Sequence, residues 1–230
     1  MFETIFKITA PISTRTKSLV VRVYALLLSG VISAACACWV DMHYTRLGGL
    51  MTALVGAMIF AGVRTGSSKA GNTGIALFLA GAALEGMSLS PLVHTAMRYY
   101  PQALTTALLT SIAVFGSFSV AAIFAKRREY LFLSGICGTV ASFLFLASLT
   151  NIFVRSSFVM DLQVYVGLAM FVSYVLIDTQ LMIERFEESY SNVNIVKPAC
   201  DLFVDLIAVF VRILIILMRK NQRKNDRSRR

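Results

Sequence analysis

Ionisable residues inside long apolar segments are the side chains of this chain best placed to do chemistry. A charged group at membrane depth costs at least about 2.5 to 3.5 kcal/mol on insertion scales, so each one is a candidate functional residue. The acids of this kind are Glu85, Asp178, Asp201 and Asp205, and the bases are Arg212 and, at the edge of its segment, Arg64. Acids in such positions can exchange protons or contact passing cations.

Asp178 and Asp205 are predicted to lie at the same depth on neighbouring antiparallel helices. Asp178 is six residues before Glu184, and Asp205 is seven residues after Pro198. At 1.5 Å per residue these separations are about 9 Å and about 10 Å, measured from the same side of the membrane. The charged connection ERFEESYSNVNIVK joins the two segments on that side.

The chemistry of this pair follows from placing two carboxylates in one site of low dielectric constant. Both cannot ionise at low cost, so the pair retains one proton. Carboxylate oxygens are also natural ligands of calcium. The sequence therefore predicts a proton-sensing pair, Asp178 and Asp205, that contacts Ca²⁺ transiently. An inert salt bridge or a hydrogen-bonded acid is the structural alternative.

The other ionisable residues are secondary candidates. Asp201, Asp205 and Arg212 follow helical spacing and share one face, which must look into the bundle or a wet cavity. Arg64 ends its segment on the side of the acid pair, so Arg64 and Arg212 are candidate latches that hold an ionised acid and release a protonated one. Glu85 precedes a proline in its segment and either lines a pore or hydrogen-bonds the opened backbone.

Seven apolar segments must position these residues. Of 230 residues, 57% are hydrophobic and 15% are charged, whereas soluble domains carry about a quarter charged residues. The predicted fold class is an all-α integral membrane protein with a bundle of about seven helices. The segments lie near residues 19–40, 47–63, 71–97, 102–125, 130–150, 162–183 and 198–218.

The segments leave space for one membrane domain and two short ends. We expect a cytosolic N-terminal segment at 1–18, the membrane bundle at 19–218 and a basic tail at 219–230. Seven spans of about 20 residues use nearly all of the chain, so a second domain is not expected. The composition of the tail is typical of disorder.

Basic residues predict the topology. Alternate connections carry eleven Lys and Arg on the side of the N-terminus and three on the other side. The positive-inside rule then places the N-terminus and the loops around Arg64, Arg127 and Glu187 in the cytosol. Seven crossings would put the seven basic residues of the tail on the other side, against the same rule. The tail charges favour the cytosol, so either the last segment does not fully cross or a hydrophilic tail is translocated.

Composition also limits partners and cofactors. The net charge of +10 is read as contact with membrane lipids, and nucleic acid is not an expected partner because no recognition fold accompanies it. The cysteines, Cys36, Cys38, Cys137 and Cys200, have no metal-ligand spacing and are expected to be reduced packing residues. No cofactor is expected.

Four segments carry a resemblance to a known family. They are YVLIDTQLMIE, CDLFVDLIAVF, RREYLFLSGI and GMSLSPLV. Along the chain the order is GMSLSPLV, RREYLFLSGI, YVLIDTQLMIE and CDLFVDLIAVF. Together, in that order, they resemble the Bax inhibitor-1 family of transmembrane proteins, over nearly the whole length.

The resemblance implies a specific fold and function. The fold is a seven-helix bundle whose last helix is central, and the activity is a pH-dependent calcium leak from the endoplasmic reticulum, associated with protection from cell death. The family's paired pore aspartates correspond to Asp178 and Asp205, and a neighbouring acid corresponds to Asp201. The arginine latch of prokaryotic members corresponds most nearly to Arg64. Glu85 departs from the uncharged residue expected at its position. Partners in the family include cell-death regulatory membrane proteins.

Three other functions use the same residues. An intramembrane aspartyl protease needs two membrane aspartates, but its G-x-G-D context is absent, so an enzyme is not expected. A proton-coupled calcium exchanger would move calcium against a gradient. A membrane scaffold that binds cell-death regulators would leave the aspartates structural.

Overall fold

Helices form every regular element among the described residues, which are 13–65, 71–125, 130, 132–188 and 193–228 of the computed structural model. Seven α-helices occupy these ranges in the predicted order, so the predicted all-α class is confirmed. They are α2 (Thr14–Val40), which continues as the π-helical turn η1 (Asp41–Thr45), α3 (Leu50–Thr65), α4 (Asn72–Tyr99), α5 (Pro101–Phe124), α6 (Leu133–Val154), α7 (Ser157–Glu188) and α8 (Val196–Ser228).

Five of the described helices are long and apolar enough to cross a membrane. They are α2 with η1, α4, α5, α6 and α7. The other two differ for physical reasons. With 16 residues, α3 spans about 24 Å at 1.5 Å per residue, less than the roughly 30 Å hydrocarbon core. The apolar stretch of α8 contains Asp201, Asp205 and Arg212.

The chain divides into two compact units. Among described residues, unit 1 consists of Tyr100–Leu181 with Asp205 onward, and unit 2 consists of residues up to Tyr99 with Met182–Val204. Helices α7 and α8 each contribute to both units, and the connection between them belongs to unit 2. Asp178 and Asp205 therefore lie in unit 1, whereas Arg64, Glu85 and Asp201 lie in unit 2.

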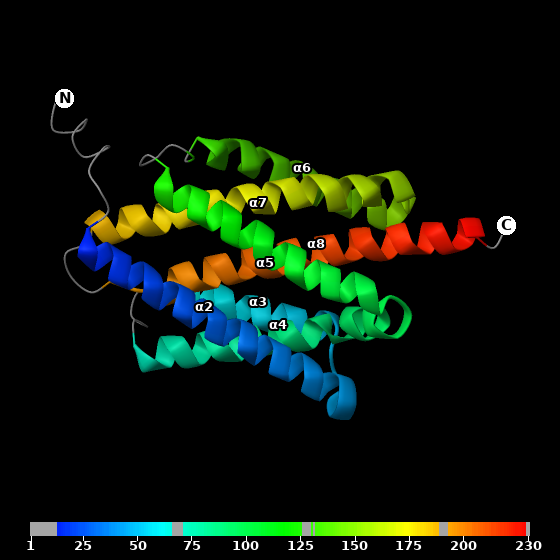
Figure 1. The fold of residues 1–230 in the computed structure, drawn as a ribbon, viewed down its shortest axis with the longest axis horizontal. Coiled ribbons are helices and arrows are strands. Elements are labelled where there is room, and N and C mark those ends of the chain that lie inside the picture. The colour runs from blue at the N-terminus through cyan, green and yellow to red at the C-terminus, as the bar shows by residue number, and fades with distance from the viewer. Residues whose placement is uncertain (1–12, 66–70, 126–129, 131, 189–192, 229–230) are drawn as a thin grey trace. The chain divides into compact units, whose positions relative to one another are not determined.

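Three aromatic rings form the centre of unit 2. Phe60 of α3, Phe78 of α4 and Phe203 of α8 pack against one another with ring centroids 5.7 to 6.1 Å apart. Gly30 of α2 faces this cluster, and a Cβ there would lie 2.5 Å from Cζ of Phe78. The cluster holds the first turns of α8 among α2, α3 and α4 (Figure 1).

Small residues allow close helix packing in unit 2, as the early segments predict. A Cβ on Gly86 of α4 would lie 2.0 Å from the carbonyl oxygen of Ala34 on α2. Such approaches are typical of membrane helices, where dispersion contacts and not the hydrophobic effect drive association.

Asp41 ties the end of α2 to α4. Its carboxylate is 1% exposed and accepts hydrogen bonds from Thr45 Oγ1 at 2.7 Å and from the amides of Leu47 at 2.7 Å and Gly48 at 3.1 Å. Ser90 Oγ of α4 donates to its other oxygen. The carboxylate thus closes the π-helical turn and anchors the following loop.

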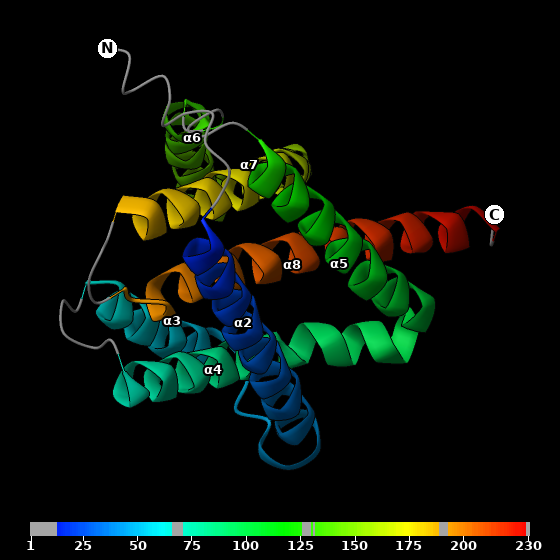
Figure 2. The ribbon, with the colours of Figure 1, turned by 60° about the vertical axis from the view of Figure 1, so that its left-hand side comes forward.

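In unit 1, α6 packs along α7 (Figure 1 and Figure 2). Cys137 and Leu144 of α6 and Met170 and Ile177 of α7 form a buried cluster. The opposite face of α6 carries exposed apolar side chains. They include Phe143, Phe145, Leu146 and Phe153, as expected of a helix that faces lipid.

The predicted burial of the last helix is found along much of α8. In unit 2, every residue from 198 to 203 is buried. In unit 1, the buried residues continue as Asp205, Val209, Phe210, Ile213 and Leu214. A helix enclosed on several sides is what the expected central position requires.

The expected disorder of the tail is a wrong prediction for residues 219–228. Helix α8 continues through these residues, and Arg219 and Arg223 form ion pairs with Asp161 near the start of α7. From Val196 to Arg219 the helix is about 35 Å long at 1.5 Å per residue, a length that could cross the hydrocarbon core. The side of the membrane on which the tail lies stays a prediction. A local charge count cannot include the long-range contact with Asp161.

The cytosolic placement of the N-terminus stays a prediction from the charge count. The start of α2 and the end of α7 lie on one side of unit 2, because the amide of Ser13 donates to Oε1 of Glu187 at 3.0 Å. The loop around Arg127 lies outside the described residues.

Removing the Asp41 carboxylate should destabilise unit 2. Asp41→Ala leaves the buried Ser90 hydroxyl and two loop amides without their acceptor, and one unsatisfied buried group costs about 1 to 3 kcal/mol. Thr45→Val, which removes a single donor, is the matched control and should cost about 1 kcal/mol or less. The measurement is the thermal unfolding midpoint of purified protein in detergent. Equal midpoints for Asp41→Ala and wild type would contradict this role.

Single cysteines at the two ends of α8 should be labelled from opposite sides of the membrane. We expect Glu188→Cys, next to the α7–α8 connection, to react with an impermeant maleimide from the cytosol, and Gln222→Cys only after the membrane is permeabilised. Both are placed in a background without native cysteines. Labelling of both positions from one side of sealed vesicles would show that α8 does not cross.

Candidate functional site

The predicted acid pair lies within unit 1. Asp178 is ten residues before the end of α7 at Glu188, and Asp205 is nine residues after the start of α8 at Val196. These positions place both carboxylates about 14 to 15 Å from the ends of helices that meet at one connection. Asp205 is 4% exposed and Asp178 is half-buried.

Tyr174 connects the two acids electrostatically. It lies one helical turn before Asp178 on α7, and its phenol interacts with the charges of both Asp178 and Asp205. A change in the protonation of either acid therefore acts on the same phenol. Both carboxylates therefore act on the phenol of Tyr174, and the sharing of a proton between them stays a prediction.

The residues after Asp178 are buried polar groups. Thr179 and Gln180 are 0% and 5% exposed. Gln180 Oε1 accepts a hydrogen bond of 2.9 Å from the amide of Tyr130, just before α6. This contact fixes the rotation of α7 about its axis, and hence the direction in which Asp178 points.

In unit 2, Arg64 pairs with Asp201. Nε of Arg64, at the end of α3, lies 2.7 Å from Oδ1 of Asp201 on α8. The Asp201 side chain is 9% exposed and the Arg64 side chain is 48% exposed, so the guanidinium reaches a buried acid from a partly open position. Arg64, a latch candidate from the sequence, is thus paired with the secondary acid Asp201, and its role as a latch stays a prediction.

Arg212, the second latch candidate, contacts an aromatic ring. Its Cζ lies 4.2 Å from the centroid of the Phe171 ring on α7, and its Nη1 donates to the carbonyl oxygen of Ala208 at 3.0 Å. The absence of a side chain at Gly167 makes room for it, since a Cβ there would lie 2.6 Å from Nε of Arg212. A ring face and a carbonyl oxygen stabilise this cation within the bundle.

Glu85 lies against α3 in unit 2. A Cβ on Gly56 would lie 3.1 Å from Oε1 of Glu85, and Ser88 Oγ lies 3.4 Å from Oε2. The glycine therefore provides space for the carboxylate at a helix–helix contact. This arrangement favours the packing interpretation of Glu85. Glu85 belongs to unit 2, whereas Asp178 and Asp205 belong to unit 1.

Two acids with partners on other elements were missed from the sequence, Asp41 and Asp161. Each stands directly at the border of an apolar segment, Asp41 after the first and Asp161 before the sixth. Acids at span borders are usually solvated, so burial and pairing across helices are not visible from their local context. The seven basic residues after Met218 were the available signal for a partner of Asp161.

No cluster of three or more His, Cys, Asp or Glu is placed to hold a metal ion in the part of the chain that the structure describes. Calcium usually takes six to eight oxygen ligands. Contact of Asp178 and Asp205 with calcium stays a prediction.

Comparison with known proteins identifies the family. Residues 16–223 match the family described as "Inhibitor of apoptosis-promoting Bax1". This match covers most of the chain. The protein belongs to the Bax inhibitor-1 family.

Named members of the Bax inhibitor-1 family are similar over most of their length. The protein called Bax inhibitor 1 from Arabidopsis thaliana is 34% identical over 206 residues, which are 88% of this chain and 81% of that protein. Bax inhibitor 1 from Homo sapiens is 32% identical over 221 residues, or 94% and 92%. Probable Bax inhibitor 1 from Paralichthys olivaceus is 32% identical over 227 residues, or 97% and 94%. The predicted resemblance is therefore confirmed.

The Arg64–Asp201 ion pair should contribute measurably to the stability of this Bax inhibitor-1 family member. Arg64→Gln leaves a buried carboxylate without its cation, which we expect to cost about 1 to 3 kcal/mol because the arginine is half exposed. Asp201→Asn should cost less, and the double variant should be more stable than the sum of the single changes predicts. Thermal midpoints of the four proteins form the cycle. Additive effects would show that the two side chains do not interact.

Proposed function

We propose that this protein is a pH-sensitive calcium leak pathway of an intracellular membrane, the endoplasmic reticulum, and not an enzyme. Asp178 and Asp205 share a proton and control the passage of calcium. The observation that carries the proposal is the placement of both carboxylates at matching positions on α7 and α8 of unit 1, in electrostatic contact with Tyr174. The calcium ion is the transported species, and no cofactor takes part.

The physical reason for pH sensitivity is the cost of charge at this depth. Two negative charges near each other in a medium of low dielectric constant repel strongly, and binding of one proton removes most of that cost. A passing calcium ion removes the same cost by a different route, because its charge attracts both carboxylates. Protons and calcium therefore compete for one pair of acids.

The Arg64–Asp201 ion pair supports the proposal of a second control point. Asp201 is one turn before Asp205 on α8, and Arg64 comes from α3. An ionised Asp201 holds the arginine, and a neutral one releases it. This latch acts on the secondary acid, a difference from the arrangement that the family resemblance implies, in which the arginine latches the aspartate pair.

The family supports a physiological role. The family is described as "Inhibitor of apoptosis-promoting Bax1" and the similar proteins are called Bax inhibitor 1. We propose that this protein also suppresses cell death, through calcium homeostasis or through cell-death regulatory membrane proteins. Flux measurements separate the alternatives. Calcium movement against its gradient, driven by protons, would identify an exchanger.

Asp178→Asn and Asp205→Asn should each flatten the pH dependence of calcium flux. A single acid cannot share a proton with an amide, so the coupled titration is lost and not merely shifted. For the wild type we expect the flux midpoint between about pH 6 and pH 8, as documented for buried acids. Purified protein in liposomes with a trapped calcium dye provides the measurement, and Glu188→Gln, an exposed acid at the end of α7, is the matched control.

In the same assay Arg64→Ala should raise flux at neutral pH.

The double variant Asp178→Asn with Asp205→Asn decides between gate and scaffold. Folded double variant with wild-type flux and an unchanged pH profile would show that the aspartates are structural. Absence of flux from the wild type, together with intact binding of cell-death regulators, would favour the scaffold.

A further inference from the structure

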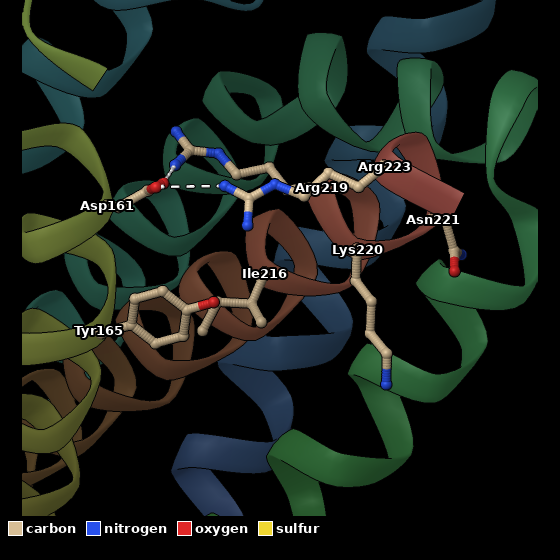
Figure 3. A pocket seen from close by; sticks show the side chains of 7 residues that line it. All are labelled: Asp161, Tyr165, Ile216, Arg219, Lys220, Asn221 and Arg223. Carbon is tan, nitrogen blue, oxygen red and sulfur yellow. Dashed lines mark hydrogen bonds and ion pairs between the residues drawn. The ribbon is translucent and has the colours of Figure 1, made fainter. Parts of the chain in front are cut away.

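A charged groove lies on unit 1 between the beginning of α7 and the end of α8 (Figure 3). It encloses about 640 Å³. This groove is separate from the acid pair, because its α7 residues lie more than three helical turns before Asp178 on the same helix. Its lining consists of Asp161, Tyr165, Ile216, Arg219, Lys220, Asn221 and Arg223.

The cations of the groove exceed its single acid. Arg219 Nη1 pairs with Oδ1 of Asp161, and Arg223 Nη2 lies 3.3 Å from Oδ2. The side chain of Lys220 points away from Asp161 (Figure 3) and has no acid partner among the described residues. Three cations against one carboxylate leave a formal surplus of two positive charges. The charge of the groove therefore suits an anion. An anion near Lys220 is least repelled by the carboxylate of Asp161.

The groove also crosses the border between apolar and charged sequence on both of its helices. On α7 the apolar segment starts at Leu162, directly after Asp161, and on α8 it ends at Met218, directly before Arg219. Tyr165 and Ile216 lie on the apolar side of this border. Tyrosine is enriched at the level of lipid headgroups. The cationic side chains on one side of the border match the headgroup of an anionic phospholipid, and the apolar side chains on the other side match its acyl chains.

Exposed apolar side chains also lie at the end of α6 and the start of α7, within unit 1. They are Phe153 with 87%, Val154 with 71% and Phe158 with 74% exposure. Large apolar groups next to a basic groove favour a membrane-embedded ligand over a soluble anion, because acyl chains cover such groups and water does not.

We propose that this groove binds the headgroup of an anionic phospholipid. Lys220 and Arg223 contact the phosphate, and Asn221 donates a further hydrogen bond. The acyl chain lies against Tyr165 and Ile216. The carboxylate of Asp161 competes with the phosphate for Arg219 and Arg223.

The test measures retention of phosphatidylserine by the full chain in phosphatidylcholine nanodiscs, using native mass spectrometry. One lysine near an anionic membrane surface contributes about 1 kcal/mol, which corresponds to about a fivefold change in affinity. We therefore expect Lys220→Gln to lower phosphatidylserine retention about fivefold. Arg155→Gln is the matched control, because Arg155 is exposed in the α6–α7 turn at the same end of unit 1 but does not line the groove. It should retain the lipid within about twofold of wild type.

Further variants and competing ligands distinguish a phospholipid site from a soluble-anion site and from an apolar groove. Asp161→Asn should release the arginines for the phosphate and raise retention, and Arg223→Lys, which keeps the charge, should remain near wild type. Equal losses for Lys220→Gln and Arg155→Gln would mean unspecific attraction and overturn the proposal. Displacement of phosphatidylserine by 10 mM inorganic phosphate would identify a soluble-anion site instead. Equal retention of phosphatidylserine and phosphatidylcholine by the wild type would leave only an apolar groove.

Discussion

The cost of placing charge among membrane helices governs this structure. An ionised side chain without a partner in hydrocarbon is expensive, so each one must find a counter-charge, a ring face or a backbone oxygen. The described helices meet this requirement in three ways: Asp201 binds Arg64, Arg212 lies over Phe171, and Asp161 binds Arg219 and Arg223. Each solution joins two helices, so the charges that destabilise single segments also specify how segments pair.

The number and order of helices could be predicted because hydrophobic runs record them locally. Helix starts and ends lie within a few residues of the expected segments, apart from α2, which begins at Thr14, and α7 and α8, which extend beyond their apolar parts. The matching distances of Asp178 and Asp205 from the ends of α7 and α8 were also predictable, since they depend only on counting residues along two helices. The tail was not, because its partner Asp161 is 58 residues before Arg219 in the chain. A rule that counts charges loop by loop contains no such contact.

The choice of partners within the candidate site was beyond the sequence for a related reason. Asp201 and Asp205 share a helix face, so their spacing cannot tell which of them meets Arg64. Packing decides: the rings of Phe60, Phe78 and Phe203 fix the first turns of α8 against α3, and Asp201 is two residues from Phe203. Burial of Asp41 is similar, because its partners include Ser90, which is 49 residues away. Periodicity indicates which faces are apolar, whereas pairing depends on the shapes of those faces.

The order of the helices in the chain explains how α8 can enter the membrane at all. Its stretch with Asp201, Asp205 and Arg212 is the least favourable of the seven for insertion on its own. Its partners Arg64 on α3, Asp161 on α7 and Phe171 on α7 all precede it in the sequence, and chains fold from the N-terminus as they are made. When α8 emerges, its counter-charges are already in the bilayer, so the relevant reference state for its charges is a partly built bundle and not bare lipid. A charged helix that entered the membrane before its partners would bear the full free-energy cost of unpaired charge in lipid.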